Sequence, residues 1–520
     1  MNRLADLISQ AGLYFAERTS LIAPDVGMTF AEVEAATNRL ASSFFGNLGL
    51  AKGDRVALLL PNCPEYIIAD LALLKAGLVR VPVNPRLAAP EVAYILEHSG
   101  AVFLITDPAF TDLVADVRES LNDLQSVAVT GPTARQGMTT WDDLLSNGAP
   151  EPFQVDTIDD DPCMLIYTSG TTGRPKGALT TVGSRLAALA NIYANEFLPG
   201  ADDVMIHAAS IAHGTGNKVL PNYLRGAANV TMPRFDADAF CAAIDTHGAT
   251  ITWLVPTMVA MMVEAARRGS YDLSSLHTIM YAGASMPEAI LADGLDRFGS
   301  VFVQIYGLTE APQPNLILPK EDHALDPSTG RPKRPGVTGR PAIGVSLKVI
   351  DDNGHQVETG EIGEIIVAGP HIMREYWNDA TATAKTLRDG WCHTGDLALV
   401  DADGYVTIID RRKDMIISGG FNVYPKEIED VLYAHAAVRE CAVIGRSDPF
   451  WGETVEAVIA LRDDNGVTAD DLVAHCADRL AGYKKPRQIT FVDDLPKTAT
   501  GKIDKKALRD TDTGTEGMSP

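Results

Sequence analysis

From about residue 50 onward, short β-rich runs alternate with helical segments, and this alternation restricts the possible folds more than any other feature of the chain. Residues 55–62, RVALLLPN, form an apolar run that is typical of a buried strand. The segment behind it, EYIIADLALLKAGL, places Ile67, Leu71 and Leu74 on one face of a helix. Such alternation predicts parallel sheets covered on both faces, with ligands bound beyond the carboxyl ends of the strands.

The same pattern continues along the chain and then changes. Further strand candidates begin at Ala101 (AVFLITD), Ala249 (ATITWLVP), His277 (HTIMYAGAS) and Val301 (VFVQIYGL). After about Gly336 the chain turns to short strands punctuated by Gly and Asp, which indicates a compact β-rich lobe. A charged stretch from Asp410, DRRKDMI, joins this lobe to a last segment that has its own strand and helix pattern.

These patterns predict an α/β protein of two domains, because 520 residues exceed what one hydrophobic core usually supports. We expect a large N-terminal domain over residues 1–410, with parallel α/β sheets and the β-rich lobe. A hinge at 411–413 would join it to a small, mobile α+β domain at 414–510. The polar tail at 511–520 is expected to be disordered.

The charge balance excludes one class of partner. The sequence holds 68 acidic and 44 basic residues, which gives a net charge of -24. This charge repels a polyphosphate backbone, so nucleic acid is a poor candidate partner. The same field opposes ATP, and any nucleotide site must therefore depend on local groups.

The cysteines and the apolar runs indicate a cytoplasmic protein. The six cysteines are widely spaced and form no C-x-x-C pair, which predicts a reduced compartment with neither a zinc site nor a disulfide framework. The N-terminal stretch carries Asp6 and Glu17 and lacks the uninterrupted apolar core of a signal peptide. No uncharged apolar run reaches membrane-spanning length, so no integral membrane contact is expected. The oligomeric state stays open, a homodimer included.

The stretch YTSGTTGRPKGA, which follows the apolar run CMLI, has the composition of a phosphate-binding loop. Its hydroxyls and glycines allow backbone N–H groups to converge on an anion, and a lysine adds positive charge. The candidate phosphate ligands are Thr168, Ser169, Gly170, Thr171, Thr172, Gly173 and Lys176. The Walker A pattern is absent from the whole chain. The alternative is a plain polar loop between a strand and a helix.

The residues from Tyr167 to Gly177 resemble the phosphate loop of the adenylate-forming superfamily of acyl-CoA synthetases, luciferases and peptide-synthetase adenylation domains. Its other motifs follow in order over nearly the whole chain: QIYGLTE from Gln304, GWCHTGD from Gly390, DRRKDMI from Asp410, SGGFNVYPKEIE from Ser418 and PKTATGKID from Pro496. Any one of them could be accidental, but together they identify the chain as a member of the AMP-dependent synthetase and ligase family. The resemblance implies ATP, Mg²⁺ and CoA as its small-molecule partners, beside a carboxylic acid.

The resemblance also implies a nucleotide site. Glu310 would hold Mg²⁺ against the phosphates, and Thr309 would donate to the α-phosphate or to the substrate carboxylate. The adenine site would comprise Gly283, Ala284, Ser285, Gln304, Tyr306 and Gly307, with Tyr306 stacking on the base. Asp396 would accept hydrogen bonds from both ribose hydroxyls, and Arg411 would support the same sugar. Taken alone, such residues are more often a helix cap, a core aromatic or a turn residue.

By the same resemblance, the last segment supplies a movable lysine. Lys502 would bridge the substrate carboxylate and the α-phosphate, although a lysine near a C-terminus is usually a solvated charge. Lys413 lies at the hinge about which the small domain would rotate between adenylate formation and thioester formation. Rotation would withdraw Lys502 and bring in a segment that leaves room for a pantetheine arm. This segment is Ser418, Gly419, Gly420 and Phe421, and a tight turn is a compatible interpretation.

The acyl side of the site is less well defined. His213 matches the family position between the acyl pocket and the thiol channel, but Ser210 and Ala212 replace the proline and the aromatic of the family pattern. A structural histidine is the alternative. Lys218 would pair with a polar substituent of the substrate if it faces the pocket, and would otherwise point to solvent. The acyl pocket is expected to be lined by the His213 region, by the segment 253–262 (WLVPTMVAMM) and by residues 281–285. Within it, Met258, Met261 and Met262 would form a soft apolar wall or belong to the plain core.

Three functions compete. The first is an acyl-CoA synthetase that forms acyl-CoA, AMP and pyrophosphate from a fatty, alicyclic or aromatic monocarboxylate, CoA and ATP. The second is a ligase that loads a separate carrier protein or stops at the acyl-adenylate. The third is a non-catalytic nucleotide- or acyl-binding protein. The joint presence of Glu310, Asp396 and Lys502 opposes the third, because a degenerate site would be expected to lose at least one of them.

Overall fold

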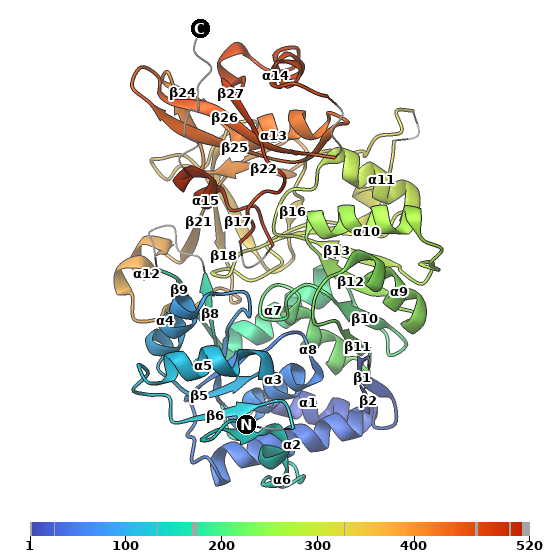
Figure 1. Ribbon diagram of the computed structural model, residues 1–520, viewed down its shortest axis with the longest axis vertical. Coiled ribbons are helices and arrows are strands. Elements are labelled where there is room, and N and C mark those ends of the chain that lie inside the picture. Colours follow the sequence, from blue (N-terminus) through green and yellow to red (C-terminus); the bar gives the residue numbers. More distant parts are fainter. Residues whose placement is uncertain are drawn as a thin grey trace.

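The computed structural model describes residues 3–24, 26–132, 134–168, 174–326, 328–462, 466–498 and 501–511. The molecule contains two large sheets, an antiparallel lobe and a C-terminal sheet, and the C-terminal elements cap one end of the molecule (Figure 1). The fold is therefore mixed α/β, as predicted. No helix in the described ranges is long and apolar enough to cross a membrane.

The first large sheet has eight strands, in the order β19 (Glu375–Tyr376), β9 (Lys176–Thr181), β8 (Pro162–Thr168), β4 (Val79–Pro82), β3 (Arg55–Leu59), β5 (Ala101–Thr106), β6 (Ser126–Val129) and β7 (Thr139–Thr140). The strands from β8 to β7 are parallel, whereas β9 runs antiparallel to β8 and β19 antiparallel to β9. The short strand β19 comes from far along the chain, so this sheet ties distant segments together. The predicted strand at 55–62 and the one from Ala101 are confirmed as β3 and β5.

The second large sheet has nine strands, in the order β16 (Arg340–Pro341), β15 (Leu316–Leu318), β14 (Phe302–Tyr306), β13 (Thr278–Tyr281), β12 (Ile251–Leu254), β10 (Val204–His207), β11 (Ala228–Thr231), β1 (Thr19–Ala23) and β2 (Val26–Thr29). Its central strands are parallel. The three strands predicted from Ala249, His277 and Val301 are confirmed as β12, β13 and β14, side by side.

Helices cover both sheets. Those of the N-terminal region are α1 (Arg3–Tyr14), α2 (Phe30–Gly46), α3 (Pro64–Ala76), α4 (Ala89–Ser99), α5 (Thr111–Arg118), α6 (Trp141–Ser146), α7 (Val182–Asn195), α8 (Gly216–Leu224), α9 (Ala237–His247), α10 (Pro256–Arg268) and α11 (Glu288–Phe298). One apolar core joins α1, α2, α3 and α8 to the first sheet, and another joins α9, α10 and α11 to the second. The helix predicted behind residues 55–62 is α3, but nearly all of its side chains are buried, not one face alone.

The remaining elements form the lobe and the C-terminal region. The antiparallel lobe contains β17 (Ser346–Ile350), β18 (Gly363–Ala368), α12 (Ala380–Thr386), β20 (Leu387–Arg388), β21 (Trp391–Val400) and β22 (Val406–Arg411). The C-terminal region contains β23 (Ile416–Ser418), β24 (Phe421–Val423), α13 (Pro425–Tyr433), β25 (Val438–Asp448), β26 (Gly452–Leu461), α14 (Ala469–Ala477), β27 (Gln488–Phe491) and α15 (Lys505–Asp510). It has its own apolar core. Residues 412–415 connect the two sheets, close to the predicted hinge at 411–413, and the hinge itself stays a prediction.

A fully buried ion pair joins α7 to α8. Lys218 on α8 donates a hydrogen bond to Glu196 Oε2 at the C-terminal end of α7, and both side chains are completely buried. Burial lowers the pKa of Lys218 and raises the pKa of Glu196, and the opposite charge of each partner counters the shift. Lys218 therefore neither faces a substrate nor points to solvent, which corrects both sequence-based interpretations.

We expect Lys218→Met to lower the free energy of unfolding by about 3–5 kcal/mol, because it leaves the Glu196 carboxylate buried without its cation. The double variant Lys218→Met/Glu196→Leu should recover most of this loss, since both charges are then absent. Urea denaturation measures all three proteins. Arg267→Ala, which breaks an exposed ion pair with Asp293, is the control and should change stability by about 1 kcal/mol at most. A loss in Lys218→Met as small as in the control would contradict the assignment.

Candidate active site

Three elements from two sheets meet around one carboxylate. Asp396 lies in β21 and is 3% exposed. Its Oδ2 accepts a hydrogen bond from Tyr306 Oη at 2.6 Å, and its Oδ1 accepts one from Arg411 Nε at 2.8 Å. Tyr306 ends β14 and Arg411 ends β22, so the two partners hold Asp396 from opposite sides. Each carboxylate oxygen keeps a further lone pair, as a ribose ligand would require.

The predicted adenine site lies at the ends of neighbouring parallel strands. Gly283, Ala284 and Ser285 follow β13, while Gln304, Tyr306 and Gly307 lie in or just after β14. Gln304 Oε1 accepts a hydrogen bond from Tyr281 Oη at 2.8 Å, which fixes the amide inside the sheet. The structure thus brings these predicted residues together at the carboxyl ends of β13 and β14. It assigns Tyr306 a hydroxyl contact with Asp396 that the sequence did not indicate.

Glu310 lies on the loop after β14 and is held by a tyrosine from the other large sheet. Tyr376 Oη donates a hydrogen bond to Glu310 Oε1, and Tyr376 lies in β19 opposite Ala178 of β9. Lys176 Nζ lies 5.2 Å from the centroid of the Tyr376 ring, close enough for a cation–π contact. Tyr376 therefore connects the predicted phosphate lysine to the predicted metal ligand. No motif in the sequence pointed to it.

Part of the predicted phosphate loop cannot be placed. Ser169, Gly170, Thr171, Thr172 and Gly173 lie outside the described residues. Thr168 ends β8 and pairs in register with Lys176 at the start of β9, so the two ends of the loop lie side by side.

Lys502 reaches the site from the C-terminal region. A Cβ atom added to Gly283 would lie 3.2 Å from Lys502 Cε, and Gly283 has a φ of +90° that other residues rarely adopt. Lys502 stays accessible to solvent, but the protein groups around it displace part of its hydration and lower its pKa to about 8; the charge of Arg411 adds to the effect while Asp396 opposes it. The lysine therefore shares its surroundings with Asp396 and Arg411, although it is distant from both in sequence. Lys413, at the predicted hinge, also lowers its pKa.

His213 lies in the turn between β10 and α8. Burial lowers the pKa of its imidazole to about 4, and the Lys502 charge adds to this shift, so the ring is neutral. Asn84 Oδ1 accepts from the Arg86 N–H, which turns the Asn84 amide nitrogen toward His213 Nε2 at 2.9 Å. His213 Nε2 is then the acceptor, and Nδ1 carries the proton.

Only part of the predicted acyl wall lies near the candidate site, and the rest belongs to the core or the surface. Trp253 in β12 packs against Gly214, next to His213, where a Cβ atom would lie 2.7 Å from the indole ring. The indole N–H donates to Gln313 Oε1 at 3.3 Å, on the loop that carries Glu310. Of the three methionines, Met262 is core and Met261 is 49% exposed, so neither forms the wall. The sequence pointed to Trp253 only as the first residue of the segment 253–262, because a buried aromatic in a strand otherwise looks like ordinary core.

The segment expected to receive a thiol forms a tight hairpin. Ser418 in β23 pairs with Phe421 in β24, and Gly419 and Gly420 have φ values of +59° and +83°, as a two-residue turn of this type requires. A Cβ atom on Gly419 would lie 2.8 Å from the Trp451 ring. Phe421 is 56% exposed and stacks on Tyr483, with centroids 4.7 Å apart. Figure 1 shows β24 at the outer end of the C-terminal sheet, away from β13.

Comparison with known proteins agrees with this geometry. The sequence model of the AMP-binding enzyme family matches residues 9–377, and that of the AMP-binding enzyme C-terminal domain matches residues 427–502. A feruloyl-CoA synthase from Amycolatopsis sp is 39% identical over 484 residues, which cover 93% of each chain. An indoleacetate–CoA ligase from Aromatoleum aromaticum is 36% identical over 498 residues, 95% of this chain and 94% of the relative.

A solved structure resembles the whole molecule. The anthranilate CoA ligase AuaEII in complex with anthranoyl-AMP has a TM-score of 0.88 and 30% identity, over 97% of this chain and 96% of that one. Sequence and structure therefore agree along nearly the full length of the protein. The chain belongs to the AMP-binding enzyme family of the adenylate-forming superfamily, as its motifs indicated.

Proposed function

We propose that the enzyme activates a carboxylic acid with ATP, releases pyrophosphate, and transfers the acyl group from the acyl-adenylate to CoA with release of AMP. The two relatives and the solved structure described above are named as CoA ligases or synthases, which supports this enzyme class. Their names refer to ferulate, indoleacetate and anthranilate, so we propose an aromatic acid ahead of the alicyclic and fatty alternatives.

The position of Lys502 carries this proposal. Adenylate formation brings a carboxylate oxygen onto the α-phosphorus, and two anions approach each other only if a cation lies between them. Lys502 lies against Gly283, within the electrostatic reach of Asp396 and Arg411. We place the ribose on Asp396 and Arg411 and the adenine against Gly283 and Tyr306, which leaves Lys502 beside the α-phosphate.

The remaining residues position the phosphates. We place them on the loop from Thr168 to Gly173 and on Lys176, with Thr309 as a donor to the α-phosphate. The described residues contain no group of three His, Cys, Asp or Glu side chains that could hold a metal ion by itself. A single carboxylate on an open loop, Glu310, suits Mg²⁺ that takes its other ligands from phosphates and water. Mg²⁺ would supply charge neutralisation there, while Tyr376 keeps the Glu310 carboxylate in place.

For the second half-reaction we propose that the C-terminal region rotates about Lys413. Rotation would withdraw Lys502 and bring the hairpin of Ser418, Gly419, Gly420 and Phe421 to the site. Beside this hairpin, Arg487 lies 4.1 Å from the centroid of the Trp451 ring. An exposed aromatic surface with a nearby guanidinium suits the base and phosphates of CoA.

The activity is tested by measuring pyrophosphate release over a panel of aromatic, alicyclic and fatty acids, with and without CoA. Release that depends on one class of acid, followed by acyl-CoA formation, is the expected result. Formation of a thioester only with an added carrier protein would favour the carrier-loading function. No pyrophosphate, acyl-adenylate or AMP with any acid would overturn the proposal.

We expect Lys502→Ala to lower the rate of adenylate formation by orders of magnitude, because the cation between the two reacting anions is lost. Thioester formation from supplied acyl-adenylate should remain largely intact, since the lysine leaves the site before that step. The two half-reactions are measured separately. Lys506→Ala removes an exposed lysine from the same region and should leave both unchanged. Equal damage to both half-reactions in Lys502→Ala would contradict the rotation.

The pH dependence follows from the pKa of about 8 for Lys502. Adenylation needs the protonated ammonium, so kcat/KM for pyrophosphate release without CoA should fall as pH rises through about 8. The residual activity of Lys502→Ala should lack this decline. A wild-type profile that stays flat up to pH values near 10, the ordinary range for lysine, would show that this proton is not needed.

We expect Asp396→Asn to raise the KM for ATP about tenfold or more, because hydrogen bonds from the ribose to a charged acceptor are weakened. The KM for the acid should change little. Arg411 is half exposed and can take water in place of the carboxylate, so the thermal unfolding midpoint should show that the variant is folded. An unchanged dependence on ATP in a folded variant would refute the ribose assignment.

A further inference from the structure

A second buried charge cluster lies beside α7, and its charges do not balance. Asp70 of α3 pairs with two guanidinium groups: its Oδ2 lies 2.8 Å from Arg80 Nη1 and 3.2 Å from Arg185 Nη2. The three side chains are 5%, 3% and 8% exposed, in the order Asp70, Arg80, Arg185. Two cations therefore share one carboxylate oxygen in the protein interior.

The neighbouring groups do not supply the missing negative charge. Burial raises the pKa of Tyr66 to about 12 and that of Cys163 to about 11, so both are neutral at physiological pH. The Met164 thioether, a weak acceptor, is the partner of Arg80 Nη2 and Arg185 Nη1. Within the described ranges, Arg185 Nε has no hydrogen-bond partner. A buried cation without a full set of partners is costly, and an anion beside it would remove that cost.

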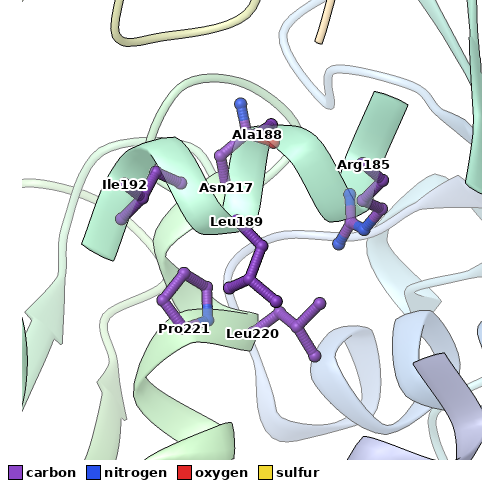
Figure 2. A pocket seen from close by; sticks show the side chains of 7 residues that line it. All are labelled: Arg185, Ala188, Leu189, Ile192, Asn217, Leu220 and Pro221. Atoms are coloured by element: carbon purple, nitrogen blue, oxygen red, sulfur yellow. The ribbon is translucent and has the colours of Figure 1, made fainter. Parts of the chain in front are cut away.

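Arg185 faces a cavity between α7 and α8. Two small adjoining hollows, both partly open to solvent, share Arg185, Ala188 and Asn217 in their walls. The outer hollow is otherwise apolar, and Figure 2 shows Arg185 toward one end of α7 and Ile192 toward the other. The lining of the inner hollow is completed by Met164, Thr180, Ser184, Pro312 and His371. Asn217 is half-buried in the wall of both hollows, so its side-chain amide can offer a polar contact to a ligand.

The inner hollow shares one element with the candidate active site, the loop that carries Glu310. Pro312 follows Glu310 by two residues on the same loop. Asn217 lies in the first turn of α8, directly after the turn in which the Gly216 N–H donates to the His213 carbonyl at 3.0 Å. An acid with its carboxylate near Lys502 and its body between these two segments would place its far end at Arg185.

We propose that the cavity between α7 and α8 binds the far end of the acid, and that Arg185 selects acids whose far end carries an anionic oxygen, a carboxylate or a phenolate. The proposal rests on the acid-activating function given above. Asp70 positions the guanidinium and Asn217 offers a second polar contact, while Leu189, Leu220 and Pro221 enclose the carbon skeleton. Arg185 is thus a specificity-determining residue and not part of the reacting centre.

The charge balance separates this role from a structural one. Removal of Arg185 leaves Asp70 paired with Arg80, so the remaining cluster is neutral. Removal of the carboxylate leaves two buried guanidinium groups without their anion. Arg185→Met should therefore remain folded with a thermal unfolding midpoint close to that of the wild type, whereas Asp70→Asn should be strongly destabilised.

The test uses pairs of aromatic acids that are identical except at the far end, where one carries a carboxylate or a phenolic hydroxyl and the other a methyl group. Pyrophosphate release gives kcat and KM for each acid. The wild-type enzyme should prefer the oxygen-bearing acid at least tenfold in kcat/KM, mainly through KM. Arg185→Met should lose this preference and use the methyl acid better, because the apolar end no longer meets an unpaired cation. Arg267→Met, at an exposed arginine, should keep the wild-type preference.

Two results with the Arg185→Met enzyme would overturn the inference. One is an Arg185→Met enzyme that keeps the wild-type preference, and the other is one that unfolds as readily as Asp70→Asn. An enzyme that activates both acids of each pair equally would refute this inference while leaving the proposed function standing. An enzyme that activates no acid at all would refute the proposed function itself.

Discussion

The site depends on the contact between one lysine and one glycine. Lys502 lies against the wall of the candidate nucleotide site at Gly283, which leaves room for the lysine stem because it has no side chain and adopts a backbone conformation that other residues avoid. The protein as a whole carries a charge of -24, so positive charge must be brought to this place locally. The C-terminal region supplies it through Lys502, and under the proposed rotation the position of that region sets which half-reaction the site can perform.

The other predicted groups are each held by a residue from a different sheet. Asp396 of the lobe is held by Tyr306 of the nine-stranded sheet, and Glu310, beyond the same sheet, is held by Tyr376 of the eight-stranded sheet. Such cross-connections fix charged side chains before any ligand arrives, which is what electrostatic stabilisation of a transition state requires. They also explain why the site lies at the junction of the sheets and not within one of them.

Two buried charge clusters involve α7 or α8, and they differ in net charge. Glu196 and Lys218 balance each other and fill their space, so they serve to join the helices. Asp70, Arg80 and Arg185 leave one positive charge over, and a cavity lies beside it. A balanced buried pair needs no ligand, whereas an unpaired buried cation is costly, which is why we propose that an anionic group of the substrate binds beside it. The net charge of each cluster, more than its residue types, therefore separates a cluster that holds helices together from one that we propose binds a ligand.

The sequence by itself determined the order of strands and helices, because apolar periodicity depends on neighbours in the chain, and it determined the chemistry, because the motifs around Glu310, Asp396 and Lys502 are local patterns. Only the tertiary structure decided that Lys218 binds Glu196, that α3 is buried on all sides, and that Tyr376 belongs to the candidate site. The tertiary structure alone also showed that Arg185 shares the Asp70 carboxylate with a second arginine. These facts are contacts between segments far apart in sequence, and such contacts arise from the packing of whole layers, which no local pattern records.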